Sequence, residues 1–161
     1  MILQTERLRL RHFTMDDLEL IIDINNHPEC IRFNRWDSMS VEDCRKTLEN
    51  WIAKYPSLEG CGVLCLETLD GEKVGMTFIM PQEKDGEYEI GFRFRRCHWE
   101  KGYATEISRN LLDYAKNHLH ATSVIGLVNV ENFRSQRVFE KLNFQRVPWD
   151  SEDGIRYQFD F

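Results

Sequence analysis

The sequence predicts an α/β fold in which a mixed, mostly antiparallel central sheet is flanked by helices. The middle of the chain carries short runs of alternating apolar and polar residues separated by turn sequences, which indicates antiparallel strands. The flanking segments carry apolar residues at helical spacing. With 161 residues, of which 42% are hydrophobic and 12% aromatic, the chain can bury a substantial core. We expect one domain over residues 1–161.

The N-terminal part predicts a strand followed by a helix. Residues 2–11 alternate between apolar and polar side chains, which is typical of a strand. Thr14 and Asp17 form a capping-box pattern that begins a helix, and His27-Pro28 ends it. Residues 29–39 show no clean period, so either a loop or a short helix fits them.

A second capping pattern, Ser40 with Asp43, predicts a helix that ends near Tyr55-Pro56. Three strands separated by turn sequences follow it, over residues 62–69, 73–80 and 88–94.

The C-terminal part predicts helices that alternate with strands. A long helix from Tyr103 to about Leu119 precedes a β-branched strand over residues 122–128, and Asn132 caps a further helix. Asn143 lies where a left-handed residue commonly ends a helix. Two strands close the chain, over residues 144–147 and 156–161. The predicted order is β-α-α-β-β-β-α-β-α-β-β, which describes a mixed sheet with helical crossovers in its second half.

Composition and charge exclude several classes of protein. A net charge of −6 and a pI near 5.4 disfavour nucleic-acid binding and are compatible with a cationic substrate such as an amine. No stretch approaches the roughly 20 apolar residues that span a bilayer, so we expect no membrane partner. The first residues, 1–7, are too polar for a signal peptide. These features predict a cytoplasmic protein.

The five cysteines indicate neither a metal site nor a disulfide framework. They are scattered, and Cys61 and Cys65 have no neighbouring Cys or His set that would complete a zinc site. We expect reduced, buried thiols and no bound metal.

Residues 88–106 carry the strongest functional signal, because a strand, a short basic loop and the first turn of a long helix follow one another there. A helix N-terminus offers backbone N–H groups without intrahelical partners and the positive end of the helix dipole. Gly102 permits close approach of an anion to the backbone, and Arg95, Arg96 and Lys101 add positive charge. The loop is therefore a candidate phosphate site. A well-capped helix with a solvated basic edge explains the loop alone about as well.

Three blocks of residues, taken in order, resemble a known family. They are Glu89-Ile90-Gly91-Phe92, the run from Trp99 to Glu106, and the run from Asn129 to Ser135 with its continuation to Phe144. This arrangement is similar to that of the GNAT superfamily of acetyl-CoA-dependent N-acetyltransferases. Together with the opening run Thr5 to Arg11, it most resembles the branch that includes the ribosomal-protein N-terminal acetyltransferases of the RimJ/RimL type.

The resemblance implies an acetyl-CoA site. In the family, backbone N–H groups of the loop before the long helix bind the CoA pyrophosphate, and here the matching residues are Trp99, Glu100, Lys101, Gly102, Tyr103 and Ala104. Glu100 departs from the glycine that the branch usually has there. The other cofactor-binding residues that the resemblance implies are Phe92, Arg93, Phe94, Asn132, Ser135 and Phe139.

Glu89 and Ser135 are the candidate catalytic residues. Attack on a thioester needs a neutral amine, and a carboxylate on the strand before the cofactor loop can take its proton, directly or through water. The alternative for Glu89 is a surface residue that pairs across strands. Many family members have a proton-donating Tyr where this chain has Phe139, so the resemblance assigns the departing thiolate to the hydroxyl of Ser135. Asn132 and Ser135 also fit a purely structural helix cap.

Aromatic residues in two loops are the candidate acceptor-binding residues. They are Phe33 and Trp36 in the N-terminal half and Trp149 near the C-terminus, the latter two with acidic neighbours. This composition suits a small-molecule or peptide amine through cation–π and ionic contacts. Packing of the same aromatics on the sheet edge is the alternative.

These observations predict an acetyl-CoA-dependent N-acetyltransferase, monomeric or homodimeric, in which a primary amine attacks directly within a ternary complex. The amine belongs to a protein N-terminus or to a small molecule. A non-catalytic acyl-CoA-binding or sensing module is the alternative from another class. A redox or structural role for the cysteines has no supporting cluster of residues.

Overall fold

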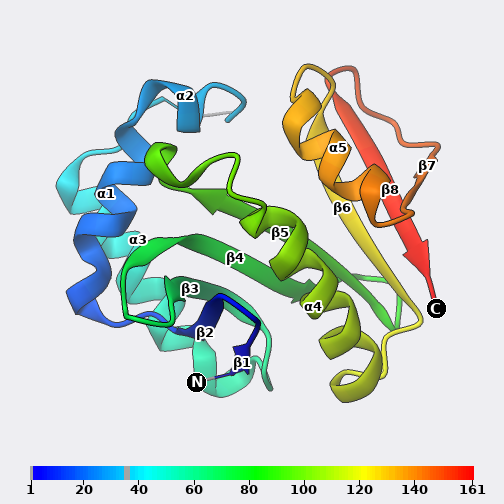
Figure 1. The fold of residues 1–161 in the computed structure, drawn as a ribbon, viewed down its shortest axis with the longest axis horizontal. Coiled ribbons are helices and arrows are strands. Elements are labelled where there is room, and N and C mark those ends of the chain that lie inside the picture. The colour runs from blue at the N-terminus through cyan, green and yellow to red at the C-terminus, as the bar shows by residue number, and fades with distance from the viewer. Residues whose placement is uncertain (1, 35–36) are drawn as a thin grey trace. The chain divides into compact units, whose positions relative to one another are not determined.

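The computed structural model describes residues 2–34 and 37–161. The strands are β1 (Leu3–Gln4), β2 (Leu8–His12), β3 (Gly62–Thr68), β4 (Lys73–Pro81), β5 (Glu87–Phe94), β6 (Ser123–Asn129), β7 (Gln145–Val147) and β8 (Gly154–Asp160). The helices are α1 (Leu18–Asn26), α2 (Pro28–Ile31), α3 (Val41–Lys54), α4 (Tyr103–His118) and α5 (Phe133–Lys141), with the short 3-10 turns η1 (Met15–Asp17), η2 (Tyr55–Ser57) and η3 (Arg96–His98) (Figure 1).

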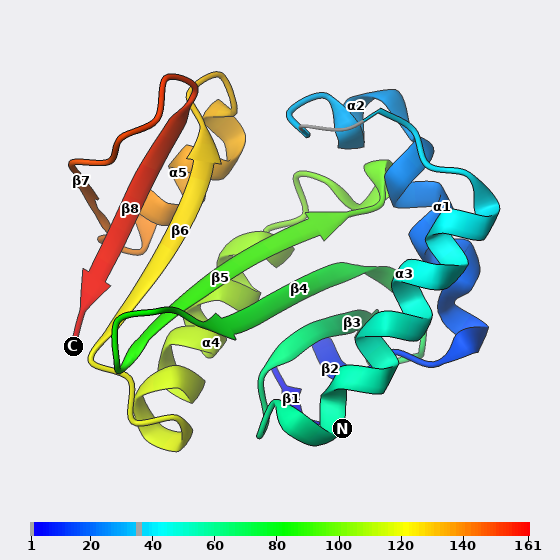
Figure 2. The same ribbon diagram turned by 180° about the vertical axis from the view of Figure 1, so that it is seen from behind.

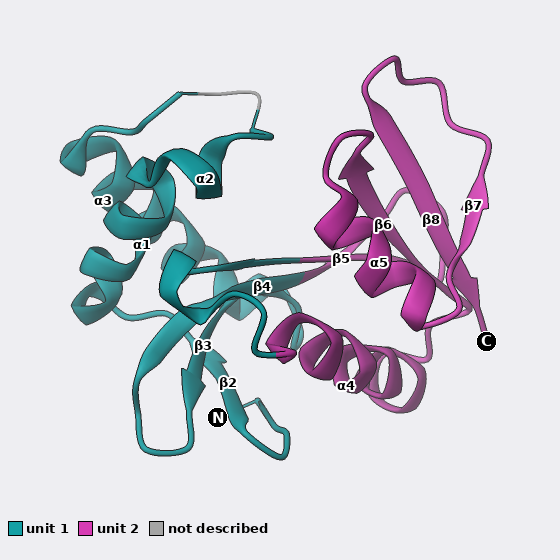
Figure 3. Ribbon diagram, turned by 45° about the horizontal axis from the view of Figure 1, so that its top comes forward, with its two compact units in different colours: residues 1–78, 92–101 teal, residues 79–91, 102–161 magenta. Residues whose placement is uncertain are grey.

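The strands are ordered β1-β2-β3-β4-β5-β6-β8-β7 in one sheet. The pairs β1/β2, β2/β3, β6/β8 and β7/β8 are antiparallel, whereas β5 and β6 are parallel. The predicted fold class, a mostly antiparallel mixed sheet flanked by helices, is confirmed. The contacts of the chain divide it into two compact units (Figure 3). Unit 1 comprises residues 1–78 and 92–101, and unit 2 comprises residues 79–91 and 102–161. The expectation of a single domain stays a prediction.

Unit 1 has its hydrophobic core between α1, α3 and the neighbouring strands. Leu20, Ile21 and Ile24 of α1 pack with Cys44 and Leu48 of α3 in one buried cluster. Both predicted caps are present. Thr14 and Asp17 form the capping box of η1, which leads into α1, and the Ser40 hydroxyl accepts a hydrogen bond from the Asp43 N–H at 3.1 Å. The caps fix where each helix begins, and the apolar stripe then decides which face is buried.

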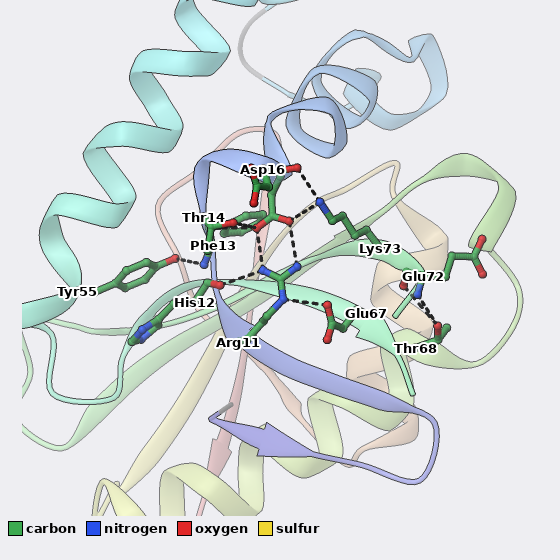
Figure 4. A network of polar contacts seen from close by, with 11 residues as sticks. Arg11, His12, Phe13, Thr14, Asp16, Tyr55, Glu67, Thr68, Glu72 and Lys73 are labelled. Atoms are coloured by element: carbon green, nitrogen blue, oxygen red, sulfur yellow. Dashed lines mark hydrogen bonds and ion pairs between the residues drawn. The ribbon is translucent and has the colours of Figure 1, made fainter. Parts of the chain in front are cut away.

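A buried ion-pair network ties β2 to η1, β3 and β4 within unit 1 (Figure 4). The Asp17 side chain is 0% exposed, and Arg11 donates to its two carboxylate oxygens at 2.7 and 2.9 Å. Lys73 Nζ lies 2.8 Å from Asp17 Oδ1, and Arg11 Nε also donates to Glu67 Oε2 at 2.8 Å. Burial alone would raise the pKa of Asp17, but the hydrogen bonds from Arg11 and Lys73 outweigh it and hold that pKa well below its usual range.

Unit 2 is built on β6 and β8, with α5 covering one of their faces (Figure 2). Phe139 of α5 is 2% exposed and stacks on Tyr157 of β8 with ring centroids 5.6 Å apart. Gly126 of β6 makes this contact possible, because a Cβ there would lie 2.2 Å from the Phe139 ring. Asn143 follows α5 with φ of 63°, the left-handed conformation expected there.

Two expectations need correction, and one open alternative is resolved. Residues 2–11 form not one strand but the antiparallel pair β1 and β2, in which the Thr5 hydroxyl accepts from the Leu8 N–H at 2.9 Å and stabilises the turn. For the segment after His27, the short-helix alternative is present as α2, which begins at Pro28 because proline suits the first position of a helix. Cys97 is exposed, so it departs from the expectation of buried thiols.

No helix in the described part of the chain is both long and apolar enough to cross a membrane. Among the same residues, no group of three or more His, Cys, Asp and Glu side chains is arranged to hold a metal ion.

We expect Asp17→Asn to lower the free energy of unfolding by about 3–5 kcal/mol, because it leaves Arg11 and Lys73 without a buried carboxylate. Chemical denaturation at pH 7 measures this loss. The control is Glu42→Gln, which removes an exposed pair with Lys46 and should cost less than about 0.5 kcal/mol. Since the pKa of Asp17 is lowered by folding, the contribution of Asp17 should be lost as the pH falls below about 4. Equal losses in the two variants would contradict this role.

Candidate active site

The loop before α4 turns through two residues in the left-handed conformation, Glu100 with φ of 64° and Gly102 with φ of 80°. Gly102 is the N-cap of α4, and its carbonyl accepts from the Glu106 N–H at 3.1 Å. Because the cap is a glycine, it supplies no side chain to the first-turn N–H groups of α4. Backbone donors at the positive end of a 16-residue helix fit a phosphate group. The cofactor that the sequence implies is therefore chemically compatible with this turn.

Lys101 is held at both its backbone and its side chain by other residues of unit 1. Arg7 Nη1 donates to the Lys101 carbonyl at 2.9 Å, and Lys101 Nζ lies 3.2 Å from His98 Nδ1. His98 is 4% exposed, and its Nε2 lies 3.2 Å from Glu72 Oε1. Burial lowers the pKa of His98, Glu72 opposes this and Lys101 adds to it, so the ring is neutral at pH 7. In a neutral ring, Nδ1 can accept a hydrogen bond from Lys101 Nζ.

The two residues before Lys101 are tied to a cluster of charged and aromatic groups. Trp99 Nε1 donates to the Phe94 carbonyl at 2.9 Å, and the Arg96 guanidinium lies 4.8 Å from the Trp99 ring centroid. Arg96 donates to Glu29 at 2.6 Å, and this bond is the main cause of the raised pKa of Arg96, to which the charge of Glu100 also contributes. Arg96 therefore lies close enough to Glu100 for their charges to interact.

The end of β5 contributes three candidate residues, all in unit 1. Arg93 donates to Asn34 Oδ1 at 2.7 Å and to Asn25 Oδ1 at 3.4 Å, and burial lowers its pKa. Phe94 is 6% exposed, and its ring centroid lies 6.2 Å from that of the half-buried Phe92. Arg93 therefore connects β5 to α1 and to the turn after α2.

Glu89 lies where the ladder between β5 and β6 ends. The register pairs Glu87 with Ser123, Tyr88 with Val124 and Glu89 with Ile125, although both strands continue further. Glu89 is half-buried, and Gln82 Nε2 donates to its Oε2 at 3.3 Å. Burial raises the pKa of Glu89, and the charge of Arg156 partly opposes that shift. A carboxylate with a raised pKa is a suitable proton acceptor.

The start of α5 holds Asn132 and Ser135. Asn132 Oδ1 accepts from the Ser135 N–H at 3.2 Å, so the structural cap foreseen as an alternative is present. Ser135 is half-buried on the first turn. Phe139 lies one turn further along, inside the core of unit 2, where its ring packs against Gly126. The buried phenyl ring carries no proton to donate.

Two of the three candidate acceptor-binding residues lie in the described part of the chain. Phe33 is half-buried with the Arg32 guanidinium 5.2 Å from its ring centroid, whereas Trp36 lies outside the described residues. Trp149 is 37% exposed and lies against Gly154, where a Cβ would approach its ring to 2.2 Å.

The register of unit 2 brings Glu89 and Trp149 to the same face of the sheet. Glu89 pairs with Ile125, and Gly154 pairs with Asn129, four residues further along β6. Side chains two or four residues apart point to the same face, so Glu89 and the Trp149 ring share it at a separation of about 13 Å along the strand. Phe139 packs on the opposite face, against Gly126.

Sequence reasoning missed Gln82, Glu87 and Arg156, whose roles depend on pairing between distant parts of the chain. It also missed the contact between His98 and Lys101. The chain between them turns through an extended Trp99 and a left-handed Glu100, a conformation that the sequence pattern does not indicate.

Comparison with known proteins identifies the class of protein. The acetyltransferase (GNAT) domain model matches residues 7–145. An N-acetyltransferase of Bacillus licheniformis, p20, whose function is uncharacterized, is 30% identical over 150 residues, which cover 89% of this chain and 82% of the relative. The chain therefore belongs to the GNAT family and is an acetyltransferase.

Solved structures share the fold at lower identity. Spermidine N-acetyltransferase from Vibrio cholerae, in complex with CoA and spermine, has a TM-score of 0.81 at 18% identity and covers 95% of both chains. The microcin C7 self-immunity acetyltransferase MccE, in complex with acetyl-CoA and AMP, has a TM-score of 0.83 at 13% identity and covers 97% of this chain and 93% of its own. The cofactor expected from the sequence, acetyl-CoA, agrees with the CoA and acetyl-CoA bound in these neighbours.

We expect Glu100→Gly to raise the free energy of unfolding by up to about 1 kcal/mol. The left-handed conformation costs a non-glycine residue about 1–2 kcal/mol, and glycine relieves this strain. The greater conformational freedom of glycine in the unfolded chain offsets part of the stabilisation. Glu100→Gln is the matched control, because it removes the charge and keeps the Cβ. A gain of equal size in both variants would show that charge, not backbone strain, is the cause.

Proposed function

We propose that this acetyltransferase transfers acetyl from acetyl-CoA to a primary amine by direct attack within a ternary complex, with Glu89 as general base. The observation that carries the proposal is the state of Glu89, a half-buried carboxylate with a raised pKa that Gln82 holds at the end of the β5/β6 ladder. A proton acceptor for an ammonium group needs these properties.

Acetyl-CoA supplies the acetyl group activated as a thioester. The first-turn N–H groups of α4, at Tyr103 and Ala104, bind phosphate oxygens in this proposal, with Gly102 allowing close approach. Trp99, Glu100 and Lys101 complete the loop. On the strength of the sequence resemblance, Phe92, Arg93, Phe94, Asn132, Ser135 and Phe139 are the further cofactor-binding residues.

The proton follows a defined route in this proposal. Glu89 accepts a proton from the attacking amine, directly or through water, and the amine nitrogen forms the new bond to the acetyl carbon. The carbon–sulfur bond breaks, and the Ser135 hydroxyl donates a hydrogen bond to the departing sulfur. Asn132 keeps Ser135 in place through the cap hydrogen bond of 3.2 Å.

The acceptor is a protein N-terminus or a small-molecule amine in the cytoplasm. Trp149 supports this class, because its exposed ring on the Glu89 face offers a cation–π surface beside the acidic side chains of Asp150, Glu152 and Asp153. Phe33 and Trp36 are proposed for the same role from the sequence. The RimJ/RimL-like assignment rests on the sequence motifs, and the enzyme acts as a monomer or homodimer.

The alternative is a non-catalytic acyl-CoA-binding module. Phe139 favours it, since the phenyl ring that occupies the position of the family's proton-donating Tyr is buried. Release of CoA thiol in the presence of amines and peptide N-termini separates the two functions. Binding of acetyl-CoA without any turnover across such a panel would favour the alternative.

Gly102→Glu should weaken acetyl-CoA binding by at least about tenfold, because it adds bulk and negative charge at the cap of α4. Isothermal titration calorimetry measures the affinity. Gly71→Glu is the matched control, since Gly71 also has a positive φ, 95°, and open space around it. If the two variants bind acetyl-CoA equally well, the phosphates lie elsewhere.

Glu89→Gln should lower kcat/KM about 100-fold at pH 7 and leave acetyl-CoA affinity unchanged, because it removes only the proton acceptor. In the wild type, kcat/KM should fall as the pH drops through the raised pKa of Glu89, since protonation inactivates the base. The exposed Glu83→Gln serves as the control on the preceding turn. An unaltered pH profile in Glu89→Gln would exclude Glu89 as the base.

A further inference from the structure

Two glutamates on one face of β5 have different partners. Glu87 and Glu89 are two residues apart and therefore point to the same face of the strand. Glu87 is 4% exposed, and Arg156 Nη2 donates to its Oε2 at 2.6 Å. Ser123 Oγ donates to Glu87 Oε1 at 3.5 Å, and Lys84 Nζ lies 3.6 Å from the same oxygen. The Glu89 carboxylate accepts a hydrogen bond from the neutral amide of Gln82.

Arg156 is placed to interact with either carboxylate. It lies on β8 opposite Leu127 of β6, and β6 separates β8 from β5. Its guanidinium therefore extends across the face of β6 to reach Glu87. The charge of Arg156 also acts on Glu89, where it opposes the effect of burial. One guanidinium and two carboxylates thus share this face of unit 2.

We propose that Glu87, Arg156 and Gln82 are positioning residues for Glu89. Glu87 retains the Arg156 guanidinium in an ion pair, which keeps that guanidinium from pairing with Glu89, and Gln82 fixes the Glu89 carboxylate by a neutral hydrogen bond. This inference rests on the proposed function of Glu89 as the base.

The burial of Glu87 explains why the guanidinium pairs with it. A carboxylate that is 4% exposed is strongly destabilised unless it is paired, whereas Glu89 is only half-buried. Arg156 therefore forms its ion pair with Glu87, and Glu89 accepts a hydrogen bond from the Gln82 amide. Direct pairing of Arg156 with Glu89 would stabilise the deprotonated form of Glu89 and make it a weaker base.

Within the described residues, both charged and neutral side chains lie near Glu89 and its face of β5. The charged ones are Glu87 on β5, Arg156 on β8 and Lys84 on the turn between β4 and β5. The neutral ones on the same face are Gln82, Ser123 and Gln158. Because Lys84 is 62% exposed, Arg156 dominates the response to removal of Glu87.

The test is Glu87→Gln, which preserves shape and removes the charge that retains Arg156. We expect Arg156 to move to Glu89 and the acid limb of the kcat/KM profile to shift to lower pH by about one unit or more. Titration of the side-chain carboxyl carbons by 13C NMR should show the same shift for Glu89 without any substrate present. Lys84→Gln is the control and should leave the limb in place. If Glu89 titrates at the same pH in Glu87→Gln as in the wild type, the inference is wrong.

The double variant Glu87→Gln/Arg156→Gln keeps the test valid if the single variant folds poorly. It replaces the ion pair by two amides and leaves no buried charge without a partner. We expect its acid limb at the wild-type pH or above, because the cation is gone. A limb at lower pH in the double variant would overturn the inference, since no guanidinium would then be present to cause it.

Glu89→Gln separates failure of this inference from failure of the proposed function. If Glu89→Gln removes the acid limb while Glu87→Gln leaves it in place, Glu89 is the base and the positioning role is wrong. If Glu89→Gln leaves the limb unchanged, the base itself is wrong, and the positioning role fails with it.

Discussion

The parallel pairing of β5 with β6 is the constraint on which the candidate site depends. Parallel neighbours cannot be joined by a hairpin, so the chain needs a crossover, and α4 supplies it. The loop that begins this crossover must follow the carboxyl end of β5, where ligands commonly bind in sheets of this kind. The pairing itself ends at Glu89. The same strand therefore carries Glu89, the proposed proton acceptor, and leads into the turn suited to phosphate.

Buried carboxylates in this protein are distinguished by their partners. Asp17 and Glu87 each accept hydrogen bonds from an arginine at 2.7 Å or less, and each is almost fully buried. Such pairs offset the cost of burying a carboxylate and tie separate elements together. Glu89 is bonded to an amide instead, and its pKa is raised. Two carboxylates of one strand face thus differ in their partners, a guanidinium for Glu87 and a neutral amide for Glu89.

Most local features of the fold could be predicted from the sequence because their causes are local. The caps at Thr14, Ser40 and Asn132 depend on residues three positions apart, and the left-handed Asn143 depends on its own backbone. The turn that splits β1 from β2 contains no glycine or proline, so periodicity alone missed it.

Partners that are distant in sequence could not be predicted. Arg156 and Glu87 are 69 residues apart, and nothing in the composition around either residue indicates the other. The candidate base was predicted from a resemblance and from its position on a strand. Its environment depends on which side chains of β5, β6 and β8 lie on the same face of the sheet, and this follows only from the register of the folded sheet.

Glu100 shows how the loop before α4 retains its shape against a local preference. The left-handed backbone conformation is unfavourable for glutamate, yet Glu100 adopts it, with φ of 64°. Strain of this kind persists only where the surroundings over-determine the backbone. The residues on either side fix the backbone here. The Trp99 side chain donates a hydrogen bond to the Phe94 carbonyl, and the Lys101 carbonyl accepts one from Arg7. The anchors on either side, rather than the residue at position 100, therefore set the path by which the chain reaches Gly102 and the first turn of α4.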